Sequence, residues 1–142
     1  MAGFIAVLSI SILLLLFLAF SVSWALRWQM RIDGYADIYR KRSERRAVYI
    51  KDNYCTDSRA ASLCDEVIGA CSLSERFRLD GLLSSRISGY EDPVLDGFED
   101  ELRSYYSSYR DCAEEFRKKE RRWYGRIVYP ILGMRCRGRF DL

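Results

Sequence analysis

Cysteine is the most reactive side chain in this 142-residue chain, which contains no histidine. The five cysteines are too widely spaced for a zinc C-x₂-C pair or a dithiol redox motif of the same spacing. Because five is an odd number, complete intramolecular pairing is excluded. We expect free, buried thiols if the domain faces a reducing compartment, and one or two disulfides if it does not. The cysteines are Cys55, Cys64, Cys71, Cys112 and Cys136.

Catalytic chemistry has little support in the sequence. Without histidine, a Ser–His or Cys–His pair cannot form, and a thiol nucleophile would have no imidazole base. Gly133 and Gly138 are isolated, and no glycine-rich phosphate loop of the G-x-x-x-x-G-K type occurs. The acidic run Glu99-Asp100-Glu101 is contiguous, which is typical of a solvated helix face rather than of two facing carboxylates. We therefore predict a protein that is not an enzyme and that needs no cofactor or metal.

Arginine accounts for 19 of the 23 basic residues. It pairs bidentately with carboxylates and phosphates, although a GC-rich genome would give the same enrichment. The charge is segregated: residues 1–46 hold seven basic and three acidic side chains, residues 47–116 seven and fifteen, and residues 117–142 nine and two. We predict that the basic regions face an anionic surface through Arg40, Lys41, Arg42, Arg45, Arg46, Arg121, Arg122, Arg126, Arg135, Arg137 and Arg139.

A transmembrane helix must position everything that follows it. Residues 1–26 carry no charged side chain, and the run from Phe4 to Leu26 is almost continuously apolar. As a helix it would span roughly 35 Å, enough for a bilayer core of about 30 Å. A cleaved signal peptide is the alternative, and Ser23 and Ala25 would form a tolerable cleavage site. That alternative is disfavoured because the start lacks Lys and Arg and the apolar run is too long, so we expect a retained anchor.

The residues that follow the apolar run predict its orientation. Basic residues outnumber acidic ones there, so the positive-inside rule places the C-terminal portion on the cytoplasmic side, or on the matrix side of a mitochondrion. Two tryptophans one helical turn apart suit the headgroup level, although they could instead pack on neighbouring residues. The predicted membrane-interface residues are Trp24, Arg27, Trp28 and Arg31.

The region after the span predicts further helix. Helical character extends from the anchor as a stalk up to Gly34, and a second helical stretch runs over about 35–52, where basic residues interrupt an apolar stripe. Residues 53–57 read as a turn. This juxtamembrane neck is assigned to residues 27–56.

Two shorter helices are predicted next. Asp57 is a candidate N-cap for a helix over 58–71, which carries apolar residues at spacings of three and four. Ser72 and Glu75 form a capping box for the following helix. Its core candidates are Phe77, Leu79, Leu82, Leu83 and Ile87.

The strongest helical pattern in the soluble part begins at Asp92-Pro93, an N-cap followed by proline at the first helical position. It predicts one long helix over about 94–124, ended by Gly125. Because the apolar stripe is rich in tyrosine, we expect it to pack mainly within the domain and partly against other subunits. The predicted packing residues are Leu95, Phe98, Leu102, Tyr105, Tyr109, Cys112, Phe116 and Trp123, with Lys119 as a polar exception.

The C-terminal segment 126–142 is predicted to be an extended basic tail. Its apolar part, 127–134, is too short to span a bilayer, so we expect it to lie on a partner or on the membrane surface. The predicted organisation is a transmembrane anchor over 1–26, a basic neck over 27–56, a helical domain over 57–125 and this tail.

Together these features predict an all-α, single-pass membrane protein with a small helical hairpin or bundle. We expect a structural or accessory subunit that tethers components of a large assembly, such as a mitochondrial respiratory complex or a viral shell linked to an internal membrane. The expected partners are other protein subunits and anionic lipid headgroups, because aromatic residues and arginine are enriched at interfaces. The alternative is a membrane-anchored module that binds anionic lipid or nucleic acid through its Arg-rich tail, of which nucleic acid is the less favoured ligand.

Overall fold

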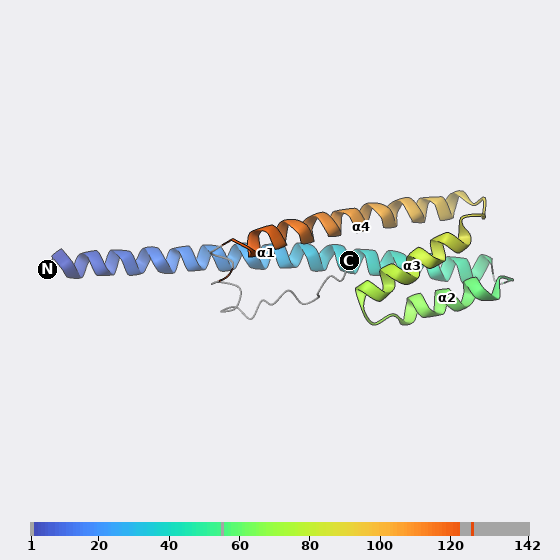
Figure 1. The fold of residues 1–142 in the computed structure, drawn as a ribbon, viewed down its shortest axis with the longest axis horizontal. Coiled ribbons are helices and arrows are strands. Elements are labelled where there is room, and N and C mark those ends of the chain that lie inside the picture. The colour runs from blue at the N-terminus through green and yellow to red at the C-terminus, as the bar shows by residue number, and fades with distance from the viewer. Residues whose placement is uncertain (1, 55, 123–125, 127–142) are drawn as a thin grey trace. The chain divides into compact units, whose positions relative to one another are not determined.

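The computed structural model describes residues 2–54, 56–122 and 126. These residues form helices and connecting turns, with no strand among them, which confirms the predicted all-α class (Figure 1). The four helices are α1 (Ala2–Asn53), α2 (Ser58–Gly69), α3 (Leu73–Ile87) and α4 (Pro93–Glu120).

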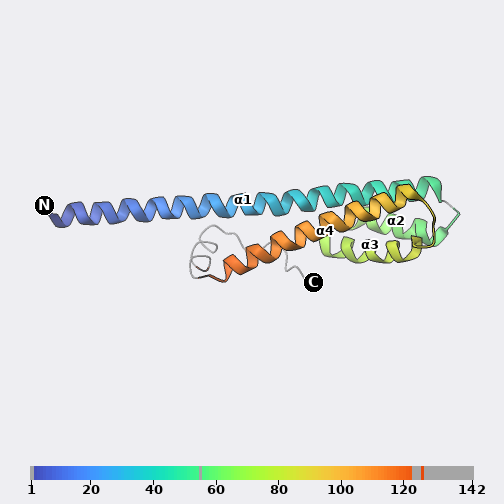
Figure 2. The same cartoon turned by 90° about the horizontal axis from the view of Figure 1, so that it is seen from above.

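Helix α1 is continuous over 52 residues, as Figure 2 shows. The predicted division into a stalk ending at Gly34 and a separate helix over 35–52 is therefore wrong. A lone glycine inside a helix costs only about 1 kcal/mol relative to alanine, so its neighbours can carry the helix through it. In addition, nothing lies within 4 Å of where a side chain at Gly34 would begin, so no packing requirement disrupts the helix there.

The starts of the other helices follow the predicted caps. The Asp57 carboxylate accepts hydrogen bonds from two backbone N–H groups of the first turn of α2, each at 3.1 Å. The Ser72 hydroxyl accepts one from the Glu75 N–H at 3.1 Å at the start of α3. At the start of α4, the Asp92 carboxylate accepts one from the Val94 N–H at 2.8 Å. Each cap satisfies backbone donors that the first helical turn leaves unpaired.

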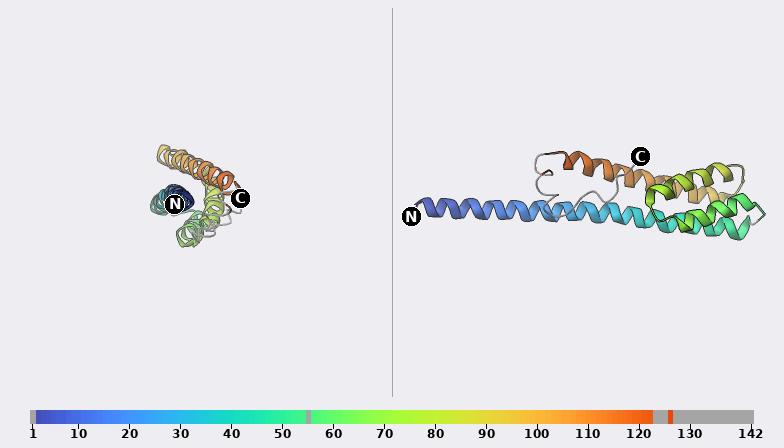
Figure 3. Two further views of the ribbon diagram at one scale, coloured as in Figure 1. Left: turned by 90° about the vertical axis from the view of Figure 1, so that its left-hand side faces the viewer. Right: turned by 60° about the horizontal axis from the view of Figure 1, so that its bottom comes forward.

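The chain divides into two compact units, and both α1 and α4 run through the two of them. The described part of the first unit comprises residues 2–32, 112–122 and 126. We call the second unit the head; its described part comprises residues 33–54 and 56–111. Within the head, α2 and α3 lie side by side against the last turns of α1 (Figure 3).

The apolar core of the head is built from small and branched side chains of all four helices. All of its members are at most 3% exposed, and Tyr49, Tyr54 and Tyr90 are among the half-buried residues that pack against them. The core residues are Ala47, Ile50, Ala60, Cys64, Val67, Leu79, Leu83, Ile87 and Leu95. Leu79, Leu83 and Ile87 were predicted; the other core candidates of α3 differ, since Phe77 is half-buried and Leu82 is exposed.

The first unit contains the apolar part of α1. This helix alone, among the described residues, is long and apolar enough to cross a membrane: an 18-residue window has a mean hydropathy of 2.9 and none of it is buried. From Phe4 to Phe17 every side chain is exposed. The segment thus presents an uncovered apolar surface on all sides.

Candidate functional site: a buried arginine network in the head

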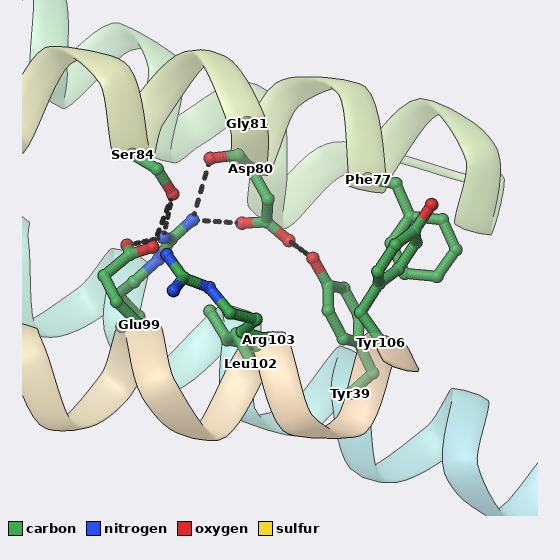
Figure 4. A pocket seen from close by; sticks show the side chains of 10 residues that line it. Tyr39, Phe77, Asp80, Gly81, Ser84, Glu99, Leu102, Arg103 and Tyr106 are labelled. Carbon is green, nitrogen blue, oxygen red and sulfur yellow. Dashed lines mark hydrogen bonds and ion pairs between the residues drawn. The ribbon is translucent and has the colours of Figure 1, made fainter. Parts of the chain in front are cut away.

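Arg46 is the centre of a charged cluster inside the head. The prediction that Arg46 faces an anionic surface is wrong, because its side chain is completely buried. Its guanidinium donates to the Asp80 carboxylate at 2.5 Å and to the Ser84 hydroxyl at 2.9 Å, and it also pairs with the Glu99 carboxylate. These partners come from α3 and α4, so one side chain of α1 connects three helices (Figure 4).

Asp80 is the main acceptor of this arginine network, which consists of Arg46, Asp80, Ser84, Glu99, Tyr39 and Ser43. Besides Arg46, the Tyr39 hydroxyl donates to the Asp80 carboxylate at 2.8 Å and the Ser43 hydroxyl at 2.9 Å. Burial and the adjacent carboxylate together raise the pKa of the Tyr39 phenol far above its usual range. A buried carboxylate needs this many donors, because an unpaired one would cost several kcal/mol.

A second buried arginine, Arg76, connects the start of α3 to α1 and α2. It donates to the Glu44 carboxylate at 2.9 Å and to the Arg40 carbonyl oxygen at 3.3 Å, both on α1. It also donates to the carbonyl oxygens of Ile68 and Ala70 at the end of α2, at 3.3 and 3.4 Å. A cation there satisfies carbonyl groups that the last helical turn leaves unpaired and interacts favourably with the helix dipole.

Two tyrosine–carboxylate clusters hold the loops at the far end of α1. Asp92 accepts hydrogen bonds from the hydroxyls of Tyr49 and Tyr54 at 2.9 and 2.7 Å, and its carboxylate raises the pKa of Tyr54 to about 12. Asp57 accepts from the Arg86 guanidinium and the Tyr90 hydroxyl, each at 2.9 Å. The hydrogen bond from Arg86, then those from the Ala60 N–H and from Tyr90, lower the pKa of Asp57 to about 2.

An open pocket of about 320 Å³ lies over the arginine network (Figure 4). It has a charged side and an aromatic side, and the charged groups at its base already pair with one another. This arrangement locks helices together and leaves no carboxylate of the network without a donor. The lining residues are Tyr39, Arg46, Phe77, Asp80, Gly81, Ser84, Glu99, Leu102, Arg103 and Tyr106.

The predicted membrane-interface residues lie in the first unit, together with the end of α4. The Lys119 ammonium nitrogen lies 4.7 Å from the ring centroid of Trp24 and 4.4 Å from that of Trp28. The Arg31 guanidinium lies 5.7 Å from the Trp28 ring centroid, and the Arg27 guanidinium donates to the Ser23 carbonyl oxygen at 3.4 Å. The distances from Lys119 and Arg31 to the tryptophan rings are typical of cation–π contacts.

The other predicted surface cations differ in their surroundings. Arg40, Arg45, Arg121, Arg122 and Arg126 are exposed. Lys41 is exposed but forms an ion pair with Asp37 at 2.7 Å, and the half-buried Arg42 pairs with Glu101 at 3.1 Å. Arg135, Arg137 and Arg139 lie outside the described residues.

The predicted packing residues of α4 line one side of that helix. Leu95, Leu102, Tyr109 and Phe116 are buried. Phe98, Tyr105, Cys112 and Lys119 are half-buried, and Trp123 and Gly125 lie outside the described residues. The predicted extent of the helix to about 124 is wrong: α4 ends at Glu120, and Arg121 and Arg122 form a turn. Tyr109 and Tyr106 both contact the Phe77 ring, so the part of the stripe up to Tyr109 packs within the head.

The cysteines of the described region are distributed without a cluster. Cys64 is buried, Cys71 is exposed and Cys112 is half-buried, and Cys64 and Cys71 are free thiols. Burial raises the pKa of the Cys64 thiol to about 11. Across residues 2–54 and 56–122, no group of three or more Cys, Asp or Glu side chains could hold a metal ion. Cys55 and Cys136 lie outside the described residues.

Sequence reasoning missed the arginine network, including Asp80, Ser84 and Glu99. One signal was present: Tyr39, Ser43, Arg46 and Ile50 follow one another at spacings of four, three and four, so that they share one face of α1. Because that face is polar in part, a pattern of apolar residues alone does not reveal it. Comparison of the chain with protein-family models, with curated proteins and with solved structures finds no match.

Proposed function

We propose that this chain is a non-catalytic, single-pass membrane protein that acts as a structural or accessory subunit of a larger assembly. Its apolar segment anchors it, and the head serves as a rigid body that binds neighbouring protein subunits. The observation that carries the proposal is the uncovered apolar surface of α1 from Phe4 to Phe17, which a chain in water would not leave exposed on every side.

Three serine hydroxyls of the apolar run from Phe4 to Leu26 support a lipid environment. The hydroxyls of Ser9, Ser11 and Ser21 each donate to a carbonyl oxygen one turn earlier, at 2.8 to 2.9 Å. In hydrocarbon, polar groups have no water to bond, so internal pairing of this kind is what a spanning helix requires. With the backbone hydrogen bonds internal beyond the first turn of α1, the segment can enter a bilayer with its backbone and these hydroxyls paired.

The head supports a scaffolding role rather than a catalytic one. Its buried polar groups are used to connect helices: Arg46 links α1 to α3 and α4, and Arg76 links α1 to α2 and α3. Such networks fix the positions of helices relative to one another within the head. A head held together in this way offers partner subunits a rigid binding surface.

The assembly in which we place the chain is a large membrane protein complex or a shell linked to an internal membrane, with the head on the cytoplasmic or matrix side. The basic residues that follow the apolar run favour that side. The alternative function, a membrane-anchored module for anionic ligands, is favoured by one observation: the basic end of α4 lies beside Trp24 and Trp28.

The test is the native mass of the full chain after extraction from its own membranes in a mild non-ionic detergent. We expect a discrete species several times heavier than the 16.7 kDa chain, with partners in fixed stoichiometry by mass spectrometry. A wash in 1 M salt without detergent serves as the control and should leave the chain on the membrane. Migration as a monomer would contradict the subunit role, and release by salt alone would contradict the anchor.

A further inference from the structure

The end of α4 and the end of the apolar part of α1 form one basic surface in the first unit. The described residues of this unit contain eight basic and three acidic side chains, and every basic one lies in 27–31 or 117–126. About 90 residues of sequence separate the two groups. The contacts of Lys119 with both Trp24 and Trp28 bring them to the same level along α1.

The position of that level follows from helix geometry. Trp24 is 20 residues after Phe4, which corresponds to about 30 Å along a helix, the thickness of a bilayer core. If Phe4 enters one leaflet, Trp24 and Trp28 reach the headgroup region of the other, where tryptophan is enriched. Because Lys119 contacts both rings, the last turn of α4 lies at headgroup level as well.

We propose that this surface, the headgroup collar, binds the phosphate groups of anionic phospholipids. It consists of Arg27, Arg31, Lys118, Lys119, Arg121 and Arg122. This inference rests on the proposed membrane anchor, and it assigns the expected contact with anionic lipid to a site formed by two segments distant in sequence.

Three features of the collar fit phospholipid headgroups. Lys118, Arg121 and Arg122 are exposed, as are Arg27 and Arg31, so their charged groups are accessible. Four to eight basic residues beside a spanning helix are typical of anionic-lipid sites, and each contributes about fivefold to binding at an anionic leaflet. The two tryptophan rings add amphipathic surface at the same depth, where lipid glycerol groups lie.

The collar also explains the use of lysine at 119 in an otherwise apolar stripe. An ammonium group above two indole rings replaces a buried apolar contact and holds α4 against α1 at the point where both meet the headgroups. A methionine there would keep the packing volume and lose the cation. The Lys119 charge thus serves two purposes: it holds α4 on α1 in the first unit, and it belongs to the lipid-binding surface.

The experiment measures quenching of tryptophan fluorescence by brominated lipids in vesicles that contain the full chain. Trp123 is replaced in all samples by Trp123→Phe, so that Trp24 and Trp28 supply the signal. One vesicle set contains 20% brominated phosphatidylserine in phosphatidylcholine, and the other contains 20% brominated phosphatidylcholine. We expect phosphatidylserine to bind beside the tryptophans at least about five times more tightly than phosphatidylcholine does.

The matched variants remove three charges each. Lys118→Gln/Arg121→Gln/Arg122→Gln should reduce the preference to less than about twofold. The control Arg59→Gln/Arg78→Gln/Arg103→Gln removes three exposed arginines of the head and should leave it unchanged. Lys119→Met should lower the preference, and Lys119→Arg should retain it.

The outcomes separate the collar from the anchor. If brominated phosphatidylcholine quenches the tryptophan fluorescence and brominated phosphatidylserine quenches it no more strongly, the collar is refuted and the membrane anchor is not. If neither lipid quenches, the tryptophans lie outside the bilayer and the anchor itself fails. An excess that persists in the Lys118/Arg121/Arg122 variant, or in Lys119→Met, would refute the contribution of α4. Loss of the excess on addition of inorganic phosphate at constant ionic strength would indicate a soluble anion as the ligand and would also overturn the proposal.

Discussion

Removal of the Arg46 charge by Arg46→Met is the sharpest test of how the head is held together. The substitution keeps an unbranched apolar stem and leaves the Asp80 carboxylate, which is 5% exposed, without its cation. Removing one partner of a buried ion pair costs about 3–5 kcal/mol, because the remaining charge stays buried and uncompensated. The Lys51–Asp65 pair offers a contrast: its N–O distance is 2.6 Å, but its side chains are 39% and 64% exposed. For Lys51→Met we therefore expect a loss below about 1 kcal/mol.

The assay is pulse proteolysis of the full chain in non-ionic detergent across a urea series. For a head of this size, the free energy of unfolding changes by about 1 kcal/mol per molar urea, so Arg46→Met should lower the unfolding midpoint by about 3 M or abolish the folded head. Lys51→Met should lower it by less than about 1 M.

A double variant keeps the test decisive if Arg46→Met fails to fold. Asp80→Asn removes the orphaned charge and can still pair with the hydroxyls of Tyr39 and Ser43. Arg46→Met/Asp80→Asn should therefore be more stable than Arg46→Met by about 2 kcal/mol. The reasoning would be refuted if Arg46→Met cost no more than Lys51→Met, or if the double variant were less stable than Arg46→Met.

Three further predictions concern titration and reactivity. Because the pKa of Asp57 is lowered to about 2, mainly by Arg86, its charge stabilises the head above about pH 4 and this contribution is lost as the pH falls toward 2. Asp57→Asn keeps the cap but cannot ionise. The stability of this variant, measured by circular dichroism, should therefore fall less between about pH 4 and pH 2 than that of the unchanged chain. Because the pKa of Tyr54 is raised to about 12, its contribution is lost as the pH rises from about 10 to 12, so Tyr54→Phe should weaken the alkaline loss of stability. At pH 8, iodoacetamide should modify the exposed Cys71 well before the buried Cys64, whose pKa is about 11, and unfolding in urea should remove the difference; equal rates in the folded chain would contradict the burial of Cys64.

Local signals made most of the helical architecture predictable. Asp57, Ser72 and Asp92 mark the starts of α2, α3 and α4 because each side chain is next to the N–H groups that it caps. The apolar run from Phe4 to Leu26 is likewise local, since length and hydropathy alone predict a span. These features depend on residues within one or two turns of each other.

The arginine network could not be predicted, because it depends on residues 34 to 53 positions apart. In sequence, Arg46 belongs to a basic run that reads as a solvated patch; its burial follows only from the way α3 and α4 pack on α1. The headgroup collar could not be predicted for the same reason, because it too is formed by residues far apart in sequence. Lys119 interrupts an apolar stripe, and its contact with Trp24 and Trp28 depends on the packing of the end of α4 against α1 within the first unit.

A nitroxide scan along α1 tests the membrane span most directly. Single cysteines from Phe4 to Arg31 would be spin-labelled in a chain whose own cysteines are replaced by serine or alanine, reconstituted into lipid vesicles. The measured quantity is the ratio of the label's accessibility to oxygen and to a water-soluble nickel complex, which rises with depth in a bilayer. We predict a maximum near Leu14 and Leu15 and a fall to the aqueous value by Arg31. A ratio that is aqueous at every position, or labels shielded from both reagents, would contradict the membrane anchor.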